Sequence, residues 1–428
     1  MKYFSTISLL LAGLILMSIS TLAQPEGTNY DESKVPQYEL PDPLTMSDGT
    51  KVTTAEQWKN QRRPELLKLF ETHVYGKTPE QEIPMQYDVS TEENALDGKA
   101  IRKQITISPK EGDNDWKMDM LLYLPKNAPR PVPVFLGLNF QGNHTIHSDP
   151  GIRITDTWMN EKPRNRRAID ADPEDTRAVA SSRWPLEMIL DRGYGLATIW
   201  YYDIDPDYDD NFQNGVHPLF YKEGQTKPAA DQWGSIGAWA WGLSRAMDYL
   251  VQDSDINENQ VALLGHSRLG KTSLWAGAQD ERFAFVISNN SGCGGAALSR
   301  RQFGETVRRI NTSFPHWFCD NFNKYNDKES ELPVDQHELI ALIAPRPVYI
   351  ASAEEDQWAD PRGEFLSGKH ASPVYELLGE PGLQATDMPP VNQPVQGTIN
   401  YHIRTGKHDV TDYDWEQYLN TADRFFRK

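Results

Sequence analysis

Cysteine is almost absent from this sequence. Its 428 residues include only Cys293 and Cys319, too few for a fold that depends on a disulfide framework. The pair could form one disulfide or remain as two buried free thiols. The sequence also lacks a CxxC pair, a phosphate-binding loop of the Walker type and a dinucleotide-binding fingerprint. No motif of these kinds therefore indicates redox, nucleotide or dinucleotide chemistry.

Positive charge is also scarce. The chain has 43 Lys and Arg against 61 Asp and Glu, which gives a net charge of −18. Nucleic acids and anionic membrane surfaces attract proteins with a surplus of positive charge. This composition argues against either of them as a partner, and we expect a monomer.

The N-terminal residues have the pattern of a secretory signal peptide. Lys2 precedes an apolar run from Ile7 to Met17, and small and polar residues follow up to Ala23. The run is short for a membrane span, and no cysteine follows it that could carry a lipid anchor. We expect cleavage after Ala23 and a secreted or periplasmic protein.

The rest of the chain is expected to form one domain preceded by an arm. Residues 24–50 are rich in Pro, Asp and Tyr and show no periodicity, which predicts an extended arm on the surface. Residues 51–428 should form a single α/β domain with insertions at about 140–180 and 289–335. In the second insertion, Trp317, Phe318 and Phe322 are expected to line a substrate wall.

Short apolar runs alternate with amphipathic helical patterns, especially in the second half of the chain. This alternation predicts a doubly wound, mostly parallel sheet with helices on both faces. The strongest helical pattern covers 234–251, and others cover 54–76, 182–192 and the final residues 415–426. The expected strands are 87–91, 100–108, 117–124, 131–138, 195–202, 261–264, 283–288, 347–351 and 398–403.

A candidate nucleophile lies in the turn after the strand 261–264. Gly265, His266 and Ser267 lead directly into a helical pattern, as in the nucleophile elbow of α/β-hydrolases. The usual second glycine would stand at Leu269, whereas here it stands at Gly270. The elbow predicts that Ser267 Oγ is exposed at a helix N-terminus, where backbone N–H groups can stabilise negative charge.

A serine nucleophile needs a base and an acid, which in this fold come later in the chain. Asp356 follows the strand 347–351, and His408 follows the strand 398–403. Both therefore belong to the edge of the sheet where open α/β folds build their sites. His402 lies within a strand and is expected to pack there, and His266 should not reach around to Ser267.

Two other groups of residues suggest metals at first sight. His144 and His147 have no accompanying carboxylate motif, so we do not expect a metal site. An Asp-rich stretch lacks the spacing of a calcium loop and its terminal glutamate, and we expect a solvated surface loop. Its members are Asp203, Asp205, Asp207, Asp209 and Asp210.

Several blocks resemble the glucuronoyl esterases of carbohydrate esterase family 15. They are GHSRLGK at 265–271, NNSGCGGAALSRR at 289–301, HWFCDNFNKY at 316–325, EEDQWADPRGEFL at 354–366 and the Gly-His loop at 406–408. The resemblance covers most of the chain after the signal peptide and includes the late glycine. It implies an α/β-hydrolase that needs no cofactor and cleaves the ester between a 4-O-methyl-glucuronate branch of xylan and a lignin alcohol.

The resemblance also implies roles for single residues. Ser267 would be the nucleophile and His408 the base, and Arg268 would help to hold the oxyanion. The planar guanidinium, which stays charged, suits that role.

Three further residues would bind the sugar by the same resemblance. Lys271 would hydrogen-bond its hydroxyls, Glu305 would bind it as a polar partner, and Trp358 would close the pocket.

One departure from the family concerns the catalytic acid. Fungal members carry a glutamate where this chain has Asn290, and an amide cannot stabilise an imidazolium as a carboxylate does. The acid is therefore assigned to Asp356, an arrangement that some bacterial members resemble, with Glu355 as the alternative. The other possible functions are an acetyl-xylan or other carbohydrate esterase, and a catalytically dead carbohydrate-binding relative.

Overall fold

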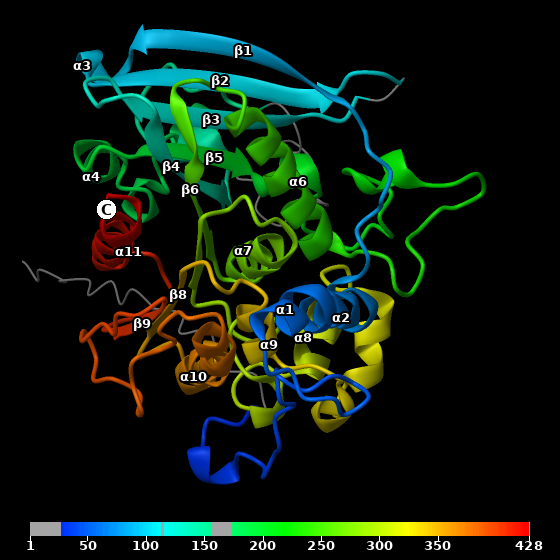
Figure 1. Ribbon diagram of the computed structural model, residues 1–428. Coiled ribbons are helices and arrows are strands. Elements are labelled where there is room, and N and C mark those ends of the chain that lie inside the picture. Colours follow the sequence, from blue (N-terminus) through cyan, green and yellow to red (C-terminus); the bar gives the residue numbers. More distant parts are fainter. Residues whose placement is uncertain (1–26, 113–114, 156–172, 428) are drawn as a thin grey trace, which may run out of the picture.

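The computed structural model describes residues 27–112, 115–155 and 173–427, and within them one nine-stranded sheet has the order β1-β2-β3-β5-β4-β6-β7-β8-β9 (Figure 1). The strands from β5 to β9 pair in parallel, whereas β1, β2 and β3 extend the sheet in antiparallel pairs up to β5. The predicted mostly parallel α/β-hydrolase sheet is confirmed. The strands are β1 (Met85–Asn94), β2 (Ala100–Pro109), β3 (Met118–Pro125), β4 (Val132–Asn139), β5 (Gly195–Trp200), β6 (Ile256–His266), β7 (Phe285–Asn289), β8 (Val348–Ala353) and β9 (Ile399–Arg404).

The helices include those expected, and among the described helices of six or more residues three were not predicted. The unpredicted ones are α8 (Val307–Ser313), α9 (Gln336–Ala341) and α10 (Pro361–Leu377). The helix expected over 54–76 is continuous in space but includes two π-helical turns, at Trp58–Arg62 and Glu71–Tyr75. The others are α1 (Ala55–Gln57), α2 (Arg63–Phe70), α3 (Ala95–Gly98), α4 (Leu186–Asp191), α5 (Tyr201–Ile204), α6 (Ser235–Leu250), α7 (Arg268–Gln279) and α11 (Asp412–Phe426).

Helices cover both faces of the sheet, each over its own hydrophobic core. On one face α6 and α7 pack on the central strands, with Trp239 and Leu274 fully buried. On the other face α4 and α11 enclose a smaller core around Trp415. Figure 1 shows α4 and α11 on the opposite side of the strands from α6 and α7. This two-sided cover buries the parallel strands and leaves their ends for a site.

The arm that precedes α1 is described from Gly27 onward. It contains one 3-10 turn, Glu32–Lys34, and a single bridge between Thr45 and Lys51, and it runs along the bottom of the view in Figure 1. The predicted signal peptide and its cleavage site after Ala23 lie outside the described residues, as does part of the insertion expected at 140–180.

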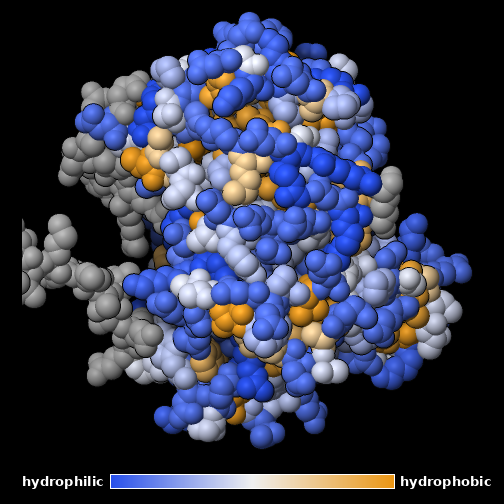
Figure 2. Space-filling view, turned by 90° about the vertical axis from the view of Figure 1, so that its left-hand side faces the viewer, coloured by the Kyte–Doolittle hydropathy of each residue, from blue (hydrophilic) through white to orange (hydrophobic). Residues whose placement is uncertain are grey.

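The described part of the chain has no helix with the length and apolar character that a membrane crossing requires. Where the structure describes the face in Figure 2, it is mostly hydrophilic, and hydrophobic residues form small separate groups. Both cysteines are buried and free, which decides between the two possibilities left by the sequence.

The second expected insertion is more ordered than the sequence suggested. Phe318 and Phe322 are buried in the main core, where their rings pack against each other at 4.8 Å. Phe318 also contacts the buried Tyr75. These two residues therefore belong to the core and not to a substrate wall, which corrects the prediction.

Candidate active site

Ser267 lies at the turn between β6 and α7 in a strained backbone conformation. Its φ is 58° and its ψ is −127°, a region that residues other than glycine seldom adopt. The backbone N–H of Ser267 donates to the carbonyl oxygen of Asn289 at 2.8 Å, which ties the turn to the end of β7. Ser267 thus has the backbone geometry of a nucleophile elbow and stands at the N-terminus of a twelve-residue helix.

Two glycines make this turn sterically possible. A Cβ at Gly265 would lie 1.8 Å from the carbonyl oxygen of Leu269, which no side chain could relieve. A Cβ at Gly270 would lie 3.0 Å from the Cβ of Ser291 and 3.1 Å from the carbonyl oxygen of Gly265. The late position of the second glycine is therefore one at which α7 packs closely on the end of β6 and on the loop after β7.

The predicted acid and base are hydrogen-bonded to each other. His408 Nδ1 lies 2.6 Å from Asp356 Oδ2, and the Asp356 side chain is 5% exposed whereas that of His408 is 40% exposed. Their loops, which follow β8 and β9, are joined by a hydrogen bond from the Glu355 N–H to the Gly406 carbonyl at 3.0 Å. Glu355, the alternative acid, is exposed.

The base stands next to the elbow. The ring of His408 lies 4.5 Å from that of His266, the residue before Ser267. Because Asp356 occupies Nδ1 of His408, Nε2 is the nitrogen available for a serine proton. Within the described residues Ser267 Oγ makes no hydrogen bond, and in ligand-free enzymes the bond between nucleophile and base is often long and tightens when substrate binds.

Asn290, where fungal relatives were expected to carry a glutamate, contacts the same acid. Its Nδ2 donates to Asp356 Oδ2 at 2.9 Å, and its backbone N–H donates to the Ala351 carbonyl at 2.7 Å. Asp356 Oδ2 thus accepts from both His408 and Asn290. An amide donor in this place holds the carboxylate oxygen in position beside His408.

Arg268 is held by a carboxylate that the sequence analysis missed. Its guanidinium forms an ion pair with Asp207 and lies 4.6 Å from the centre of the Trp317 ring. Asp207 also accepts from Trp317 Nε1 at 2.7 Å and contacts His316 Nε2 at 3.0 Å. Burial opposes the ionisation of Asp207, but Arg268 and His316 outweigh it and hold its pKa well below the usual range. The guanidinium beside the elbow is therefore fixed in place.

The Asp-rich stretch after β5 is not a solvated loop, which corrects the prediction for three of its members. Asp203, Asp205 and Asp207 are 4%, 3% and 7% exposed. Asp205 accepts from Ser235 Oγ at 2.5 Å and contacts His217 Nδ1 at 2.9 Å, so it connects this stretch to the start of α6. These aspartates are buried because each has a partner from a distant part of the chain.

Lys271 and Glu305 meet beside the elbow. Lys271 Nζ donates to the carbonyl oxygens of Ser291 and Cys293, both at 2.6 Å, and lies 3.6 Å from Glu305 Oε2. Burial raises the pKa of Glu305, and the Lys271 ammonium opposes that rise. The Glu305 N–H donates to the carbonyl of Trp358 at 3.0 Å, and Trp358 is half-buried. The structure therefore brings the three predicted sugar-binding residues together.

Glu364 on α10 hydrogen-bonds to the loop after β7 and to β8. The sequence analysis also missed this residue. Its Oε1 accepts from the N–H groups of Ser291 and Gly292 at 2.8 and 3.0 Å, and its Oε2 accepts from Ser352 Oγ at 2.6 Å. Burial raises the pKa of Glu364 to about 8, although these hydrogen bonds favour the ionised form. This carboxyl joins the loop after β7, which carries Asn290, to the end of β8, which precedes Asp356.

The raised pKa of Glu364 predicts a pH-dependent stability. Between the ordinary glutamate pKa of 4.5 and about 8, the folded state holds a proton that the unfolded state has lost. The free energy of unfolding should therefore fall as pH rises through this window, by at most ~1.4 kcal/mol per pH unit. Glu364→Gln keeps the shape of the protonated carboxyl and has no proton to lose. Its free energy of unfolding should therefore fall less than that of wild type over the same pH window.

Denaturant unfolding of both proteins at several pH values between 5 and 8 measures this difference. Glu258→Gln, at an exposed glutamate of β6, is the control for loss of one carboxylate. If wild type and Glu364→Gln give parallel curves, Glu364 is ionised in the folded protein and the assignment is wrong.

The other histidines have structural partners. His402 is fully buried between Tyr349 and Asp414, at 2.9 Å from each, as its position inside a strand predicted. His266 Nδ1 lies 2.6 Å from Asn289 Oδ1, and burial keeps its pKa well below the usual value. His144 contacts Thr176, whereas His147 contacts Glu187, so the two histidines have separate partners.

Comparison with known proteins places this chain in a family. A family model described as fungal glucuronyl esterase matches residues 195–379. Carbohydrate esterase MZ0003, from an unknown prokaryotic organism, is 58% identical over 402 residues, which are 94% of this chain and 93% of that protein.

Two solved structures share both the sequence and the fold. A structure described as a promiscuous CE15 esterase from a marine bacterial metagenome is 57% identical, with a TM-score of 0.86 over 93% of this chain and 99% of that one. A glucuronoyl esterase from Solibacter usitatus is 51% identical, with a TM-score of 0.87 over 91% of this chain and 99% of that one. The chain therefore belongs to the glucuronoyl esterase family, carbohydrate esterase family 15, and resembles its bacterial members.

Proposed function

We propose that this protein is an exported serine esterase that hydrolyses the ester between a 4-O-methyl-glucuronate branch of xylan and an alcohol of lignin. The observation that carries the proposal is the hydrogen-bonded pair of His408 and Asp356 beside the strained elbow of Ser267. A pair of this kind is what converts a serine hydroxyl into a nucleophile.

The reaction follows from these positions. Ser267 Oγ attacks the ester carbonyl carbon while His408 Nε2 takes its proton, and Asp356 stabilises the imidazolium that forms. The tetrahedral intermediate then expels the alcohol, which receives the proton from His408. A water molecule, activated by the same histidine, attacks the acyl-enzyme and releases the uronic acid together with free Ser267.

The negative oxygen of the tetrahedral intermediate needs donors that are already in place. The backbone N–H of Arg268 follows the nucleophile directly, which is the usual position of one donor. The Arg268 guanidinium adds a positive charge, and its fixation by Asp207 and the Trp317 ring supports the role because no reorganisation is then needed.

The acyl side of the substrate is assigned to the polar wall next to the elbow. Lys271 gives two of its three hydrogens to backbone carbonyls, so one remains for a sugar hydroxyl or for Glu305. Glu305 can accept from hydroxyls, and Trp358 offers an aromatic face beside it. A uronate ring has hydroxyls for these groups, whereas an acetyl group has none.

A second candidate function is a carbohydrate esterase with broader acyl specificity, such as an acetyl-xylan esterase. It is favoured by the relative that is described as promiscuous. The two candidates differ in how strongly the enzyme distinguishes a uronate from an acetate with the same alcohol.

Benzyl glucuronate and benzyl acetate provide that comparison, because only the acyl part changes. We expect kcat/KM for the glucuronate to exceed that for the acetate by ~100-fold or more, since buried polar groups left without partners penalise the smaller acyl group. Equal or reversed values would favour the broader esterase. No turnover of either ester by correctly folded protein would favour the catalytically inactive carbohydrate-binding relative.

Export, a monomeric state and a need for neither metal nor cofactor complete the proposal. Export rests on the pattern of residues 1–23.

A further inference from the structure

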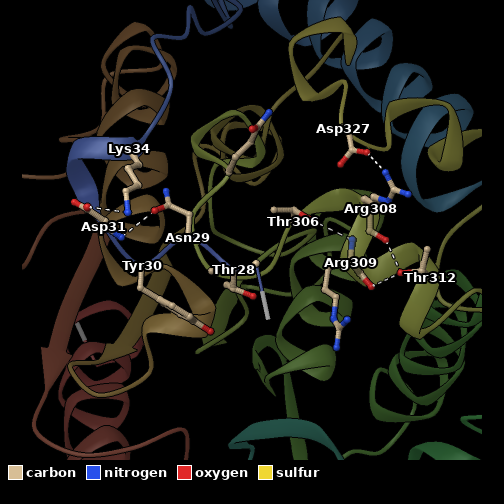
Figure 3. Close-up of a pocket in the computed structure, with 13 residues that line it drawn as sticks. Thr28, Asn29, Tyr30, Asp31, Lys34, Thr306, Arg308, Arg309, Thr312 and Asp327 are labelled. Carbon is tan, nitrogen blue, oxygen red and sulfur yellow. Dashed lines mark hydrogen bonds and ion pairs between the residues drawn. The ribbon is translucent and has the colours of Figure 1, made fainter. Parts of the chain in front are cut away.

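A large cavity lies between the N-terminal arm and α8, outside the cluster around Ser267. Its volume is about 890 Å³, within the range of about 300–1,000 Å³ that is usual for small-molecule sites. Figure 3 shows arm residues on one side of it and residues of α8 and the preceding loop on the other. We call it the arm cavity, and its lining includes Tyr30, Asp31, Lys34, Thr306, Arg308 and Arg309.

The arm cavity shares a wall with the proposed sugar site. Gly304 lines the cavity, and its N–H donates to the Asn29 carbonyl of the arm at 2.9 Å. The next residue is Glu305, whose N–H donates to the Trp358 carbonyl at 3.0 Å. One short segment therefore binds the arm on one side and faces Lys271 on the other.

The arm is fixed at this wall by side chains as well. Arg301 forms ion pairs with Glu32 of the arm at 2.6 Å and with Asp360, the N-cap of α10, at 2.8 Å. The Tyr30 ring packs edge-on against Phe303 at 6.0 Å. Burial raises the pKa of the Tyr30 hydroxyl, and the nearby charges of Asp356 and Glu305 raise it further. Tyr30 thus lines the arm cavity, and its hydroxyl is near enough to Asp356 and Glu305 for their charges to act on it.

The charges of the lining leave one cation without a partner. Arg308 pairs with Asp327, and Lys34 pairs with Asp31 at 3.4 Å. The guanidinium of Arg309 has no carboxylate and no hydrogen-bond acceptor within reach among the described residues, and in Figure 3 it extends away from Arg308 and Asp327. An unpaired guanidinium beside polar hydroxyl groups is suited to a carboxylate, which it can bind through two parallel hydrogen bonds.

We propose that the arm cavity is a second carbohydrate subsite, which takes sugars attached to the esterified uronate and holds a free carboxylate of an acidic saccharide at Arg309. The proposal rests on the proposed function, because it extends the substrate beyond the uronate ring. Thr306 supplies a hydroxyl for polar contacts with a sugar. Tyr30 supplies an apolar ring face together with a hydroxyl. The catalytic cluster recognises the ester, and the arm cavity recognises what the ester is attached to.

The test compares three substrates. They are methyl glucuronate, a xylo-oligosaccharide with one methyl-esterified glucuronate, and the same oligosaccharide with an additional free glucuronate branch. For wild type we expect KM to fall from the first substrate to the third. Arg309→Gln should raise KM about 10-fold for the third substrate only, as expected for one lost hydrogen-bonded charge pair, and Arg309→Glu should raise it further.

The matched control is Lys110→Gln, an exposed lysine directly after β2. Figure 1 shows β2 at the opposite end of the molecule from the arm, so this variant removes a surface charge without touching the cavity. It should leave all three KM values unchanged. Titration of the Ser267→Ala variant with the free-acid oligosaccharide, with and without Arg309→Gln, measures the same subsite without turnover.

The outcomes separate the two proposals. If Arg309→Gln changes KM equally for all three substrates or for none, the arm cavity is not a subsite, whereas turnover of methyl glucuronate would still support the esterase. If wild type turns over none of the glucuronate esters but the titration shows binding that depends on Arg309, the proposed function fails and the carbohydrate site stands.

Discussion

Ser267→Ala is expected to lower kcat for benzyl glucuronate by ~1,000-fold or more, and His408→Ala by a similar factor. Either change removes the acyl-enzyme route, because the hydroxyl and the imidazole act as one unit. The double variant should therefore lose little beyond either single one. Steady-state kinetics of the four proteins test this expectation, and multiplicative losses would show that the two residues do not act together.

A matched control exists for the histidine. His147 also lies beside a carboxylate, that of Glu187 at 3.0 Å, but it is far in sequence from the elbow and its loops. His147→Ala should change kcat by less than a few-fold. Thermal unfolding of each variant distinguishes lost chemistry from lost structure, since Ser267 is partly exposed and His408 is exposed, so that truncating either side chain should not unfold the protein.

The second large effect concerns the acid. Asp356→Asn should lower kcat at neutral pH by about 1,000- to 10,000-fold, because an amide favours the wrong tautomer of His408 and cannot stabilise its charged form. Glu355→Gln, one residue away and exposed, should cost much less. If Glu355→Gln were the damaging change and Asp356→Asn nearly silent, the acid would move by one residue.

Asn290 offers a way to restore the lost carboxylate. Asn290 Nδ2 and His408 Nδ1 contact the same oxygen of Asp356, at 2.9 and 2.6 Å, so the amide and the ring lie on either side of one hydrogen-bond acceptor. A glutamate at 290 is one methylene longer and can extend toward the ring. Added to Asp356→Asn, the substitution Asn290→Glu should therefore recover part of the lost kcat on benzyl glucuronate. Asn290→Gln, added to the same Asp356→Asn protein, should recover none of it.

Local pattern was sufficient to predict the elbow and the positions of the strands along the chain. Gly265, Ser267 and Gly270 lie within six residues, and the closest clash, that of a Cβ at Gly265 with the Leu269 carbonyl, arises inside this segment. The assignment of Asp356 and His408 used the order of acid and base along the chain in this fold and the rule that loops after parallel strands meet at one edge. These predictions required no knowledge of which distant residues touch.

The parts that sequence reasoning missed depend on long-range partners. Asp207 stands in a stretch that resembles a solvated loop, and it is buried because Arg268, His316 and Trp317 reach it from positions 61 to 110 residues away. Glu364 likewise has partners 12 to 73 residues distant. A single charged residue gives no signal of burial when its compensating charges and donors come from elsewhere.

The unpredicted helix α10 was hidden for a different reason. It includes Pro361, Gly363, Gly368 and Pro373, residues that normally mark turns. Pro361 is at the first turn, where proline is tolerated, and Asp360 caps the helix by accepting from the Gly363 N–H at 2.9 Å. Tertiary packing then holds the helix despite its weak intrinsic propensity.

The hydrogen bond between Asn290 and Asp356 has a consequence for how such enzymes diverge. The loops after neighbouring strands β7 and β8 meet at Asp356 Oδ2, which Asn290 and His408 both contact, so a lineage can acquire a carboxylate on one loop before it loses the carboxylate on the other. The intermediate carries both, and it never passes through a stage without a functional acid. Catalytic residues in this fold can therefore migrate between loops by single substitutions, and a missing acid at one familiar position is poor evidence that a descendant has lost its activity.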